Sequence, residues 1–214
     1  MSLTLASALA EMPLVAILRG VKPDEVEAIA EAIVTAGIRI LEVPLNSPDP
    51  LTSIGLLARS LAGRALVGAG TVLTVEDVAG VAGAGGTVIV SPNTNVEVIR
   101  ASKARGLLSL PGFFTPSEAF AALDAGADAL KLFPAEMASP AAVKAMRAVL
   151  PANTRMLVVG GVSPQTIPPY LAVGVDGFGV GSDLYAVGRG AAEVGERAAA
   201  LTAAIRALHG ERMA

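Results

Sequence analysis

Short apolar runs alternate with helix-forming segments along the whole chain. The first run, residues 13–20, is apolar up to Arg19, which is typical of a strand buried on both faces of a parallel sheet. The next segment, 22–36, has a proline and acidic residues at its start and Gly37 after its end, which predicts a helix. The order then recurs. Strands are predicted at 13–20, 38–44, 65–71, 87–91, 107–110, 127–134, 155–159 and 175–180, and helices at 22–36, 48–61, 75–82, 96–104, 115–125, 140–150, 163–173 and 191–209.

This alternation indicates an α/β fold. Eight strands, each followed by a helix in a chain of 214 residues, predict a (β/α)8 TIM barrel, preceded by an N-terminal helix. An open doubly wound sheet is the alternative. No low-complexity linker divides the chain, so we expect a single domain over residues 1–214.

Composition narrows the class of function. With 53% hydrophobic and 16% charged residues, the chain can bury a large core. It has no apolar stretch near twenty residues and no basic segment at its start, so neither a membrane span nor a signal peptide is predicted. A net charge of -3, two tyrosines and no tryptophan argue against nucleic acid as a partner. A small-molecule enzyme is the expectation.

The sequence contains few of the residues that thiol or metal chemistry would need. Cysteine is absent, which excludes a disulfide framework and is compatible with a cytoplasmic protein. His209 is the only histidine, so a zinc site would depend almost wholly on carboxylates. We therefore expect no metal and no cofactor.

Polar residues stand near the carboxyl ends of four predicted strands. Lys131 is the lone cation of the sixth strand, and Arg19, Glu42 and Thr71 end the first, second and third. Counting alternate residues puts each on the same face as apolar strand neighbours, for the third strand residues 67, 69 and 71. Active sites of such barrels lie at this end, so the four side chains are expected to share one cavity.

Each of these residues alone also has an ordinary structural interpretation. Lys131 could lay its stem on the barrel wall with its amine in water, and Arg19 could be a surface cation at a loop entry. Glu42 could pair with a cation, and Thr71 could be an ordinary strand residue. Together they suit carbonyl chemistry on an anionic substrate. A desolvated lysine can attack a ketone, a carboxylate can move protons, and an arginine can grip a carboxylate or phosphate.

Two glycine-rich segments follow the last two strands. They are Val158-Val-Gly-Gly-Val-Ser163 and Gly177-Phe-Gly-Val-Gly-Ser-Asp183, in the loops where many barrels bind phosphate through backbone N–H groups and a helix N-terminus. The glycines could instead serve tight turns. Pro92 and Pro111, directly after the fourth and fifth strands, could line the mouth but are better interpreted as rigid turns.

The chain resembles the pyruvate-dependent class I aldolases of the 2-keto-3-deoxy-6-phosphogluconate group. The resemblance covers nearly the whole length. It implies that Lys131 is the Schiff-base lysine and Glu42 the proton-transferring carboxylate. It further implies substrate binding by Arg19 and Thr71 at the keto acid end and by Gly161, Gly181 and Ser182 at the phosphate. It rests on Ala16-Ile-Leu-Arg-Gly20, Glu42-Val-Pro-Leu-Asn-Ser-Pro48, Gly68-Ala-Gly-Thr-Val-Leu73, Glu97-Val-Ile-Arg100, Ala129-Leu-Lys-Leu-Phe-Pro134, Val159-Gly-Gly-Val162 and Gly181-Ser-Asp-Leu-Tyr185.

The resemblance also implies a substrate and an assembly. Asn46 stands where many gluconate-type members carry arginine, which agrees with members that cleave 2-dehydro-3-deoxy-6-phospho-D-galactonate to pyruvate and D-glyceraldehyde 3-phosphate. The gluconate epimer and 4-hydroxy-2-oxoglutarate stay open as main substrates, and a non-catalytic sugar-phosphate sensor is the alternative outside enzymes. Members are commonly trimers, so a homotrimer is expected.

Overall fold

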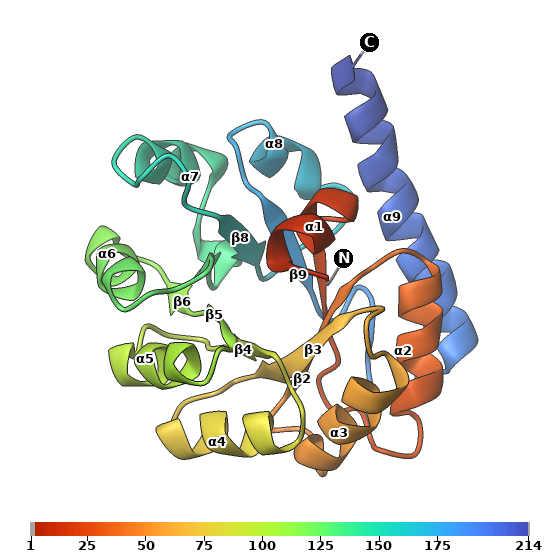
Figure 1. Ribbon diagram of the computed structural model, residues 1–214. Coiled ribbons are helices and arrows are strands. Elements are labelled where there is room, and N and C mark those ends of the chain that lie inside the picture. Colours follow the sequence, from red (N-terminus) through yellow and green to blue (C-terminus); the bar gives the residue numbers. More distant parts are fainter. Residues whose placement is uncertain (1–2, 214) are drawn as a thin grey trace.

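The computed structural model describes residues 3–213, with side chains to residue 208, and forms the predicted barrel. Figure 1 looks along the barrel, with the helices in a ring around the strands. Met1, Ser2 and Ala214, at the ends of the expected domain, lie outside the described residues. The helices are α1 (Leu5–Glu11), α2 (Val26–Thr35), α3 (Pro50–Ser60), α4 (Val75–Gly83), α5 (Val96–Ala104), α6 (Pro116–Asp124), η1 (Ala135–Met137), α7 (Pro140–Arg147), α8 (Ile167–Leu171) and α9 (Ala191–Met213). The strands are β1 (Leu14–Ile17), β2 (Ile40–Pro44), β3 (Leu66–Gly70), β4 (Val88–Val90), β5 (Leu108–Leu110), β6 (Gly112–Phe113), β7 (Leu130–Leu132), β8 (Met156–Val159) and β9 (Gly177–Val180).

The sheet closes through an interrupted strand. All the strand pairings within residues 3–213 are parallel, and the order is β5-β4-β3-β2-β1-β9-β8-β7-β6. Between β5 and β6 lies Pro111, which has no N–H to donate, but its carbonyl accepts a hydrogen bond from the Lys131 N–H at 2.8 Å. The strand predicted at 107–110 therefore ended too early, and Pro111 lies within the barrel wall rather than in a turn. Closure rules out the open doubly wound sheet.

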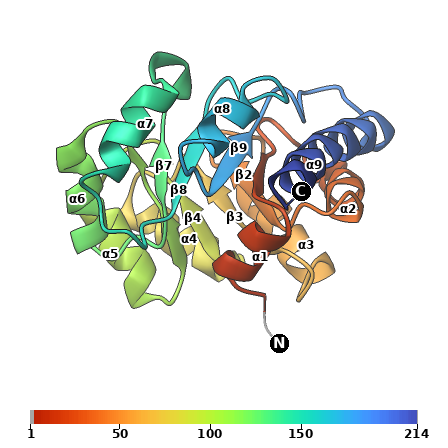
Figure 2. The ribbon, with the colours of Figure 1, turned by 90° about the horizontal axis from the view of Figure 1, so that it is seen from above.

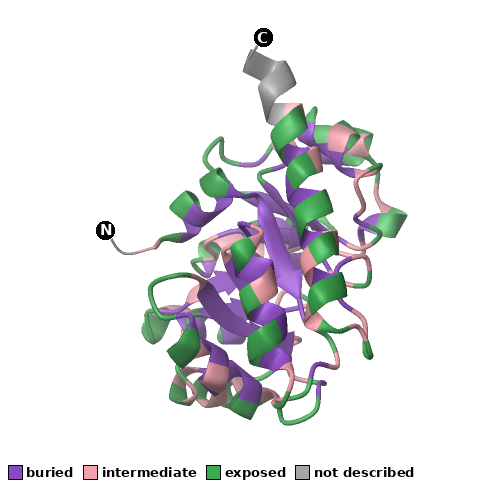
Figure 3. Cartoon of the chain, turned by 90° about the vertical axis from the view of Figure 1, so that its right-hand side faces the viewer, coloured by how far each residue is buried: buried purple, intermediate pink, exposed green. Residues whose placement is uncertain are grey.

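Two apolar layers surround the sheet. The outer layer packs the strands against the helices, and Figure 3 shows buried strands behind helices whose outer faces are exposed. The inner layer fills the barrel and is covered at the amino-terminal end by α1, which crosses the barrel in Figure 1 and lies at its edge in Figure 2. Because this end is filled, the barrel can open only at the carboxyl ends of its strands. The inner layer comprises Leu5, Ala8, Leu9, Val15, Ile40, Leu66, Val88, Val90, Leu110, Ala129 and Leu157.

Several helices differ in length from their predictions, among them α2, α7, α8 and α9. The helix expected at 163–173 is confined to α8, because Pro168 and Pro169 lack N–H groups and are tolerated only in a first helical turn. The last helix, α9, continues past the expected end at His209 to Met213 and packs along α2. No helix among residues 3–213 is both long enough and apolar enough to cross a bilayer.

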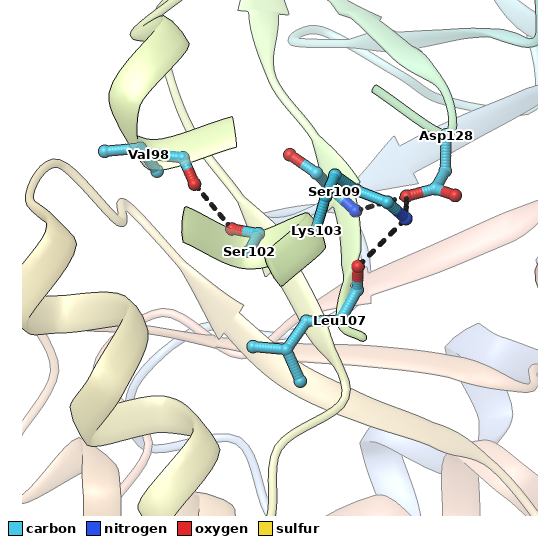
Figure 4. Close-up of polar contacts among 6 residues, drawn as sticks. All are labelled: Val98, Ser102, Lys103, Leu107, Ser109 and Asp128. Carbon is cyan, nitrogen blue, oxygen red and sulfur yellow. Dashed lines mark hydrogen bonds and ion pairs between the residues drawn. The ribbon is translucent and has the colours of Figure 1, made fainter. Parts of the chain in front are cut away.

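A partly buried cluster of hydrogen bonds holds the segment just before β7, the strand that carries Lys131. Asp128 Oδ2 accepts hydrogen bonds from the Ser109 N–H at 2.8 Å and from Lys103 Nζ at 2.6 Å, as Figure 4 shows. Lys103 also donates to the Leu107 carbonyl at 3.1 Å. The carboxylate thus ties α5 and β5 to the segment that leads into β7, across the seam where the barrel closes.

Replacement of Asp128 by alanine is expected to lower the free energy of unfolding by about 2 kcal/mol, because it leaves a backbone N–H and an ammonium without their charged acceptor. For a chain of this size the loss corresponds to a fall in Tm of about 4–8 °C. Thermal melts followed by circular dichroism measure it, with the exposed Asp124→Ala as the matched control. Equal melting of the two variants would contradict this role.

Candidate active site

One cavity of about 540 Å³ opens at the carboxyl ends of the strands. All the site residues proposed from the sequence contribute to its lining. They come from different strands and loops, so closure of the barrel is what brings them together. They are Arg19, Glu42, Thr71, Lys131, Gly161, Gly181 and Ser182.

Glu42 lies at the inner end of the cavity, on β2, and is 2% exposed. Burial raises the pKa of its carboxyl to about 7, although the positive charges of Lys131 and Arg19 oppose that rise. Among the described residues, Oε2 has no hydrogen-bond partner. The carboxyl can therefore exist in either protonation state near neutral pH.

Lys131 projects from β7 and is 6% exposed. Burial lowers the pKa of its ammonium, the charge of Glu42 works against that decrease, and the charge of Arg19 adds to it. Its Nζ also lies 4.7 Å from the centre of the Phe133 ring, a contact that favours the charged form. Desolvation is the largest of these influences, so the neutral, nucleophilic amine is more accessible than in water.

Arg19 stands at the cavity mouth, where its orientation is fixed from the loop after β2. Its Nη1 donates to Asn46 Oδ1 at 2.7 Å, and the next N–H, of Gly20, donates to Ser47 Oγ at 2.9 Å. The side chains of Asn46 and Ser47 thus hold the turn that carries the guanidinium. A fixed, exposed arginine at the mouth is suited to an anionic group of a ligand.

Thr71 lines the cavity for a different reason from the one predicted. The strand neighbours expected to share its face, Val67 and Ala69, pack outward against the helices. Thr71 instead follows the end of β3 with φ 58°, a left-handed conformation that interrupts the alternation of the strand. The assumed parity of the third strand was therefore wrong, although the residue still lies in the cavity.

The two glycine-rich loops, which follow β8 and β9, form one side of the cavity. Gly161, Gly181 and Ser182 line it, but α8 begins only at Ile167 and α9 only at Ala191, so neither helix starts at these residues. The expected helix N-terminus is thus absent there, and only the loop backbone can contribute N–H groups.

Sequence reasoning missed Glu136, in η1, which also lines the cavity. A Cβ on Gly160 would lie 2.1 Å from Glu136 Oε2, and the φ of 112° at Gly160 independently favours glycine there. The available signal was its place in the loop directly after the lysine strand. Further lining residues to which the sequence analysis gave no role are Phe133, Val159, Asp183 and Tyr185. Pro92 also lines the cavity, which agrees with the alternative that it lies at the mouth.

No group of three or more histidine, cysteine, aspartate or glutamate side chains within the described part of the chain is placed to hold a metal ion. The groups that line the cavity are the amine of Lys131, the guanidinium of Arg19, backbone N–H groups and the carboxyl groups of Glu42, Glu136 and Asp183. In a closed parallel barrel these groups are typical of an enzyme that acts on an anionic carbonyl compound.

Comparisons with known proteins give the family. The sequence model of the KDPG and KHG aldolases matches residues 5–204, and the chain belongs to this family. It is 46% identical over 200 residues, 94% of each chain, to a protein of Rhizobium meliloti (strain 1021) named probable 2-dehydro-3-deoxy-6-phosphogalactonate aldolase. It is 43% identical over 196 residues to 2-dehydro-3-deoxy-6-phosphogalactonate aldolase of Escherichia coli (strain K12), with 92% of this chain and 96% of that one covered. The solved structure described as native KDPGal superposes with a TM-score of 0.92 at 41% identity, covering 98% of this chain and 100% of that chain.

Proposed function

We propose that the protein is a Schiff-base aldolase that reversibly cleaves 2-dehydro-3-deoxy-6-phospho-D-galactonate to pyruvate and D-glyceraldehyde 3-phosphate. The observation that carries the proposal is that Lys131 and Glu42 are both buried and line one cavity, where burial raises the pKa of Glu42 to about 7. The names of the two bacterial relatives support the galactonate epimer.

The reaction begins at the ketone carbon of the substrate. The neutral amine of Lys131 adds to this carbon, and loss of water gives an iminium that withdraws electrons from the neighbouring carbon–carbon bond. Glu42, as carboxylate, accepts the proton of the hydroxyl group at the fourth carbon, directly or through water. The bond between the third and fourth carbons breaks, its electron pair forms an enamine on Lys131, and the aldehyde leaves.

The second half of the reaction restores the enzyme. The protonated Glu42 returns its proton to the terminal carbon of the enamine, which becomes the iminium of pyruvate. Addition of water releases pyruvate and the free amine. A carboxyl whose pKa lies near 7 serves both directions of this transfer, because neither the acid nor the base form is scarce at neutral pH.

The remaining groups of the cavity would hold the substrate. Arg19 and Thr71 bind the carboxylate of the keto acid, and the N–H groups and hydroxyl of Gly161, Gly181 and Ser182 bind the phosphate. The shared lining of one cavity supports the assignment, because Arg19, Thr71 and the two glycine loops can all contact a single substrate there.

Substrate preference is tested by comparing kcat/KM for the phosphorylated galactonate, its gluconate epimer and 4-hydroxy-2-oxoglutarate. We expect the galactonate compound to give the highest value, and the unphosphorylated 4-hydroxy-2-oxoglutarate the lowest because it leaves the phosphate loops unused. A higher value for either competitor would reassign the main substrate within the family. Tight binding of all three without cleavage would instead indicate a sugar-phosphate sensor.

We further propose a single-domain homotrimer in the cytoplasm. One sheet containing every strand of the described residues supports a single domain, and cooperative unfolding in one calorimetric transition would test it.

Exposed apolar side chains such as Phe114, 37% exposed, and Met137, 75% exposed, support an interface between subunits. Sedimentation equilibrium measures the oligomeric state, and cell fractionation the location.

A further inference from the structure

Glu42 rests directly on a glycine of the neighbouring strand. A Cβ placed on Gly70 of β3 would lie 1.9 Å from Glu42 Oε2, 2.4 Å from its Cδ and 2.5 Å from its Oε1. These distances are all below those that real Cβ atoms show, so the carboxyl group occupies the volume that any side chain at position 70 would need. Gly70 is not in the left-handed region, so its backbone conformation gives no reason for glycine at this position.

The conflict at Gly70 differs in kind from that at Gly68, two residues earlier on the same strand. A Cβ on Gly68 would meet the backbone of Val88 on β4, with its carbonyl oxygen at 1.8 Å. Such a conflict can be relieved only by separating strands. At Gly70 the nearest atoms all belong to the end of one side chain, which can rotate, so a methyl group there would move the carboxylate and leave the strands in place.

We propose that Gly70 is a positioning residue for proton transfer: its missing side chain lets the Glu42 carboxyl lie flat against β3, in the dry inner end of the cavity. The inference rests on the proposed aldolase function for its kinetic consequences, but not for its structural ones. Lys131 and Arg19 are the charged groups that act on this carboxyl, from β7 and from the loop after β1. Displacement from β3 moves the carboxyl into the cavity, toward water and these two cations.

The first measurement is independent of activity. In protein labelled with carbon-13 at the glutamate carboxyl carbons, wild type should show one resonance that titrates near pH 7, absent from Glu42→Gln and thereby assigned. In Gly70→Ala this midpoint should fall by about one pH unit, because hydration and closer cations both favour the carboxylate. Gly83→Ala, on α4 where a Cβ meets nothing within 4 Å, is the control and should leave the midpoint unchanged.

The second measurement separates positioning from damage to the fold. We expect Gly70→Ala to lower kcat about a hundredfold through misplacement of the proton-transferring group, while pyruvate and borohydride still modify Lys131. Adding Gly70→Ala to Glu42→Gln should then cost less than about threefold more, because the carboxyl that the glycine positions is already absent. The same Gly70→Ala change in wild type should cost the full hundredfold.

A third comparison covers the case in which Gly70→Ala is unstable. In a Glu42→Ala background the contested volume is vacant, so adding Gly70→Ala should not change Tm. An equal loss of Tm in both backgrounds would place the conflict elsewhere and overturn the proposal, as would an unchanged carboxyl titration or fully multiplicative effects of the two substitutions on kcat. If wild type lacks aldolase activity, the proposed function fails, whereas the titration and melting results still decide the role of Gly70.

Discussion

Lys131→Ala is expected to reduce aldol cleavage by at least about a thousandfold, because the variant has no amine to form the covalent intermediate. The fold should survive, since the change shortens a side chain that lines a cavity and removes a buried charge rather than adding one. Steady-state cleavage assays measure the loss, and circular dichroism reports the fold.

The covalent step itself is tested by incubation with pyruvate and borohydride. Intact-protein and peptide mass spectrometry should find the reduced adduct on Lys131 in wild type and no adduct in Lys131→Ala. Lys144→Ala, which removes an exposed lysine of α7, is the matched control and should be modified at Lys131 as wild type is. Continued cleavage by a wild-type enzyme whose Lys131 stays unmodified would sink the Schiff-base mechanism.

Glu42→Gln should lower kcat by about 10²- to 10⁴-fold, the range of a positioned acid–base group. The amide keeps the shape of the carboxyl but cannot accept the proton of the substrate hydroxyl. The borohydride adduct with pyruvate should still form, because Lys131 is retained. A variant with wild-type kcat would remove Glu42 from the mechanism.

The pH dependence of Glu42 has a definite sign. Its pKa in the free protein is about 7, and the carboxylate is the form that accepts a proton during cleavage, so kcat/KM for cleavage should fall as the pH drops below about 7. Lys131 adds a dependence of the same sign, because its protonated form cannot attack the ketone. In Glu42→Gln only the Lys131 contribution should remain, and a pH series of kcat/KM for both proteins measures the difference. Identical profiles would contradict the role of Glu42.

The positions of strands and helices could be predicted from the sequence, because burial produces short-range patterns of apolar residues. Continuous apolar runs mark strands covered on both faces, and glycine and proline mark where helices stop and start, as with Gly37 after α2 and Pro116 at the first position of α6. Thr115 and Glu118 form the capping box that this spacing predicts. The same alternation placed Arg19, Glu42 and Lys131 correctly at one end of the barrel.

Contacts between residues far apart in the chain produce no such short-range pattern, so the sequence did not predict them. Pro111 looked like a turn because its missing N–H breaks a strand locally, but its carbonyl completes the pairing with Lys131 across the closing seam. Thr71 kept its place in the cavity only because a left-handed backbone conformation overrides strand parity. Glu136 lines the cavity from η1, in the loop after β7, and no periodic pattern in the sequence predicts the direction of such a loop.

The amino-acid sequence alone predicts the barrel, the strand that carries the lysine and the carboxylate at the end of the second strand, because each follows from short-range periodicity in burial. The exclusion of water from that carboxylate, and its contact with Gly70, are visible only in the folded barrel. The contact with Gly70 depends on the pairing of β2 with β3, and the pKa of Glu42 near 7 depends on burial inside the closed barrel. Both require segments far apart in the chain to come together.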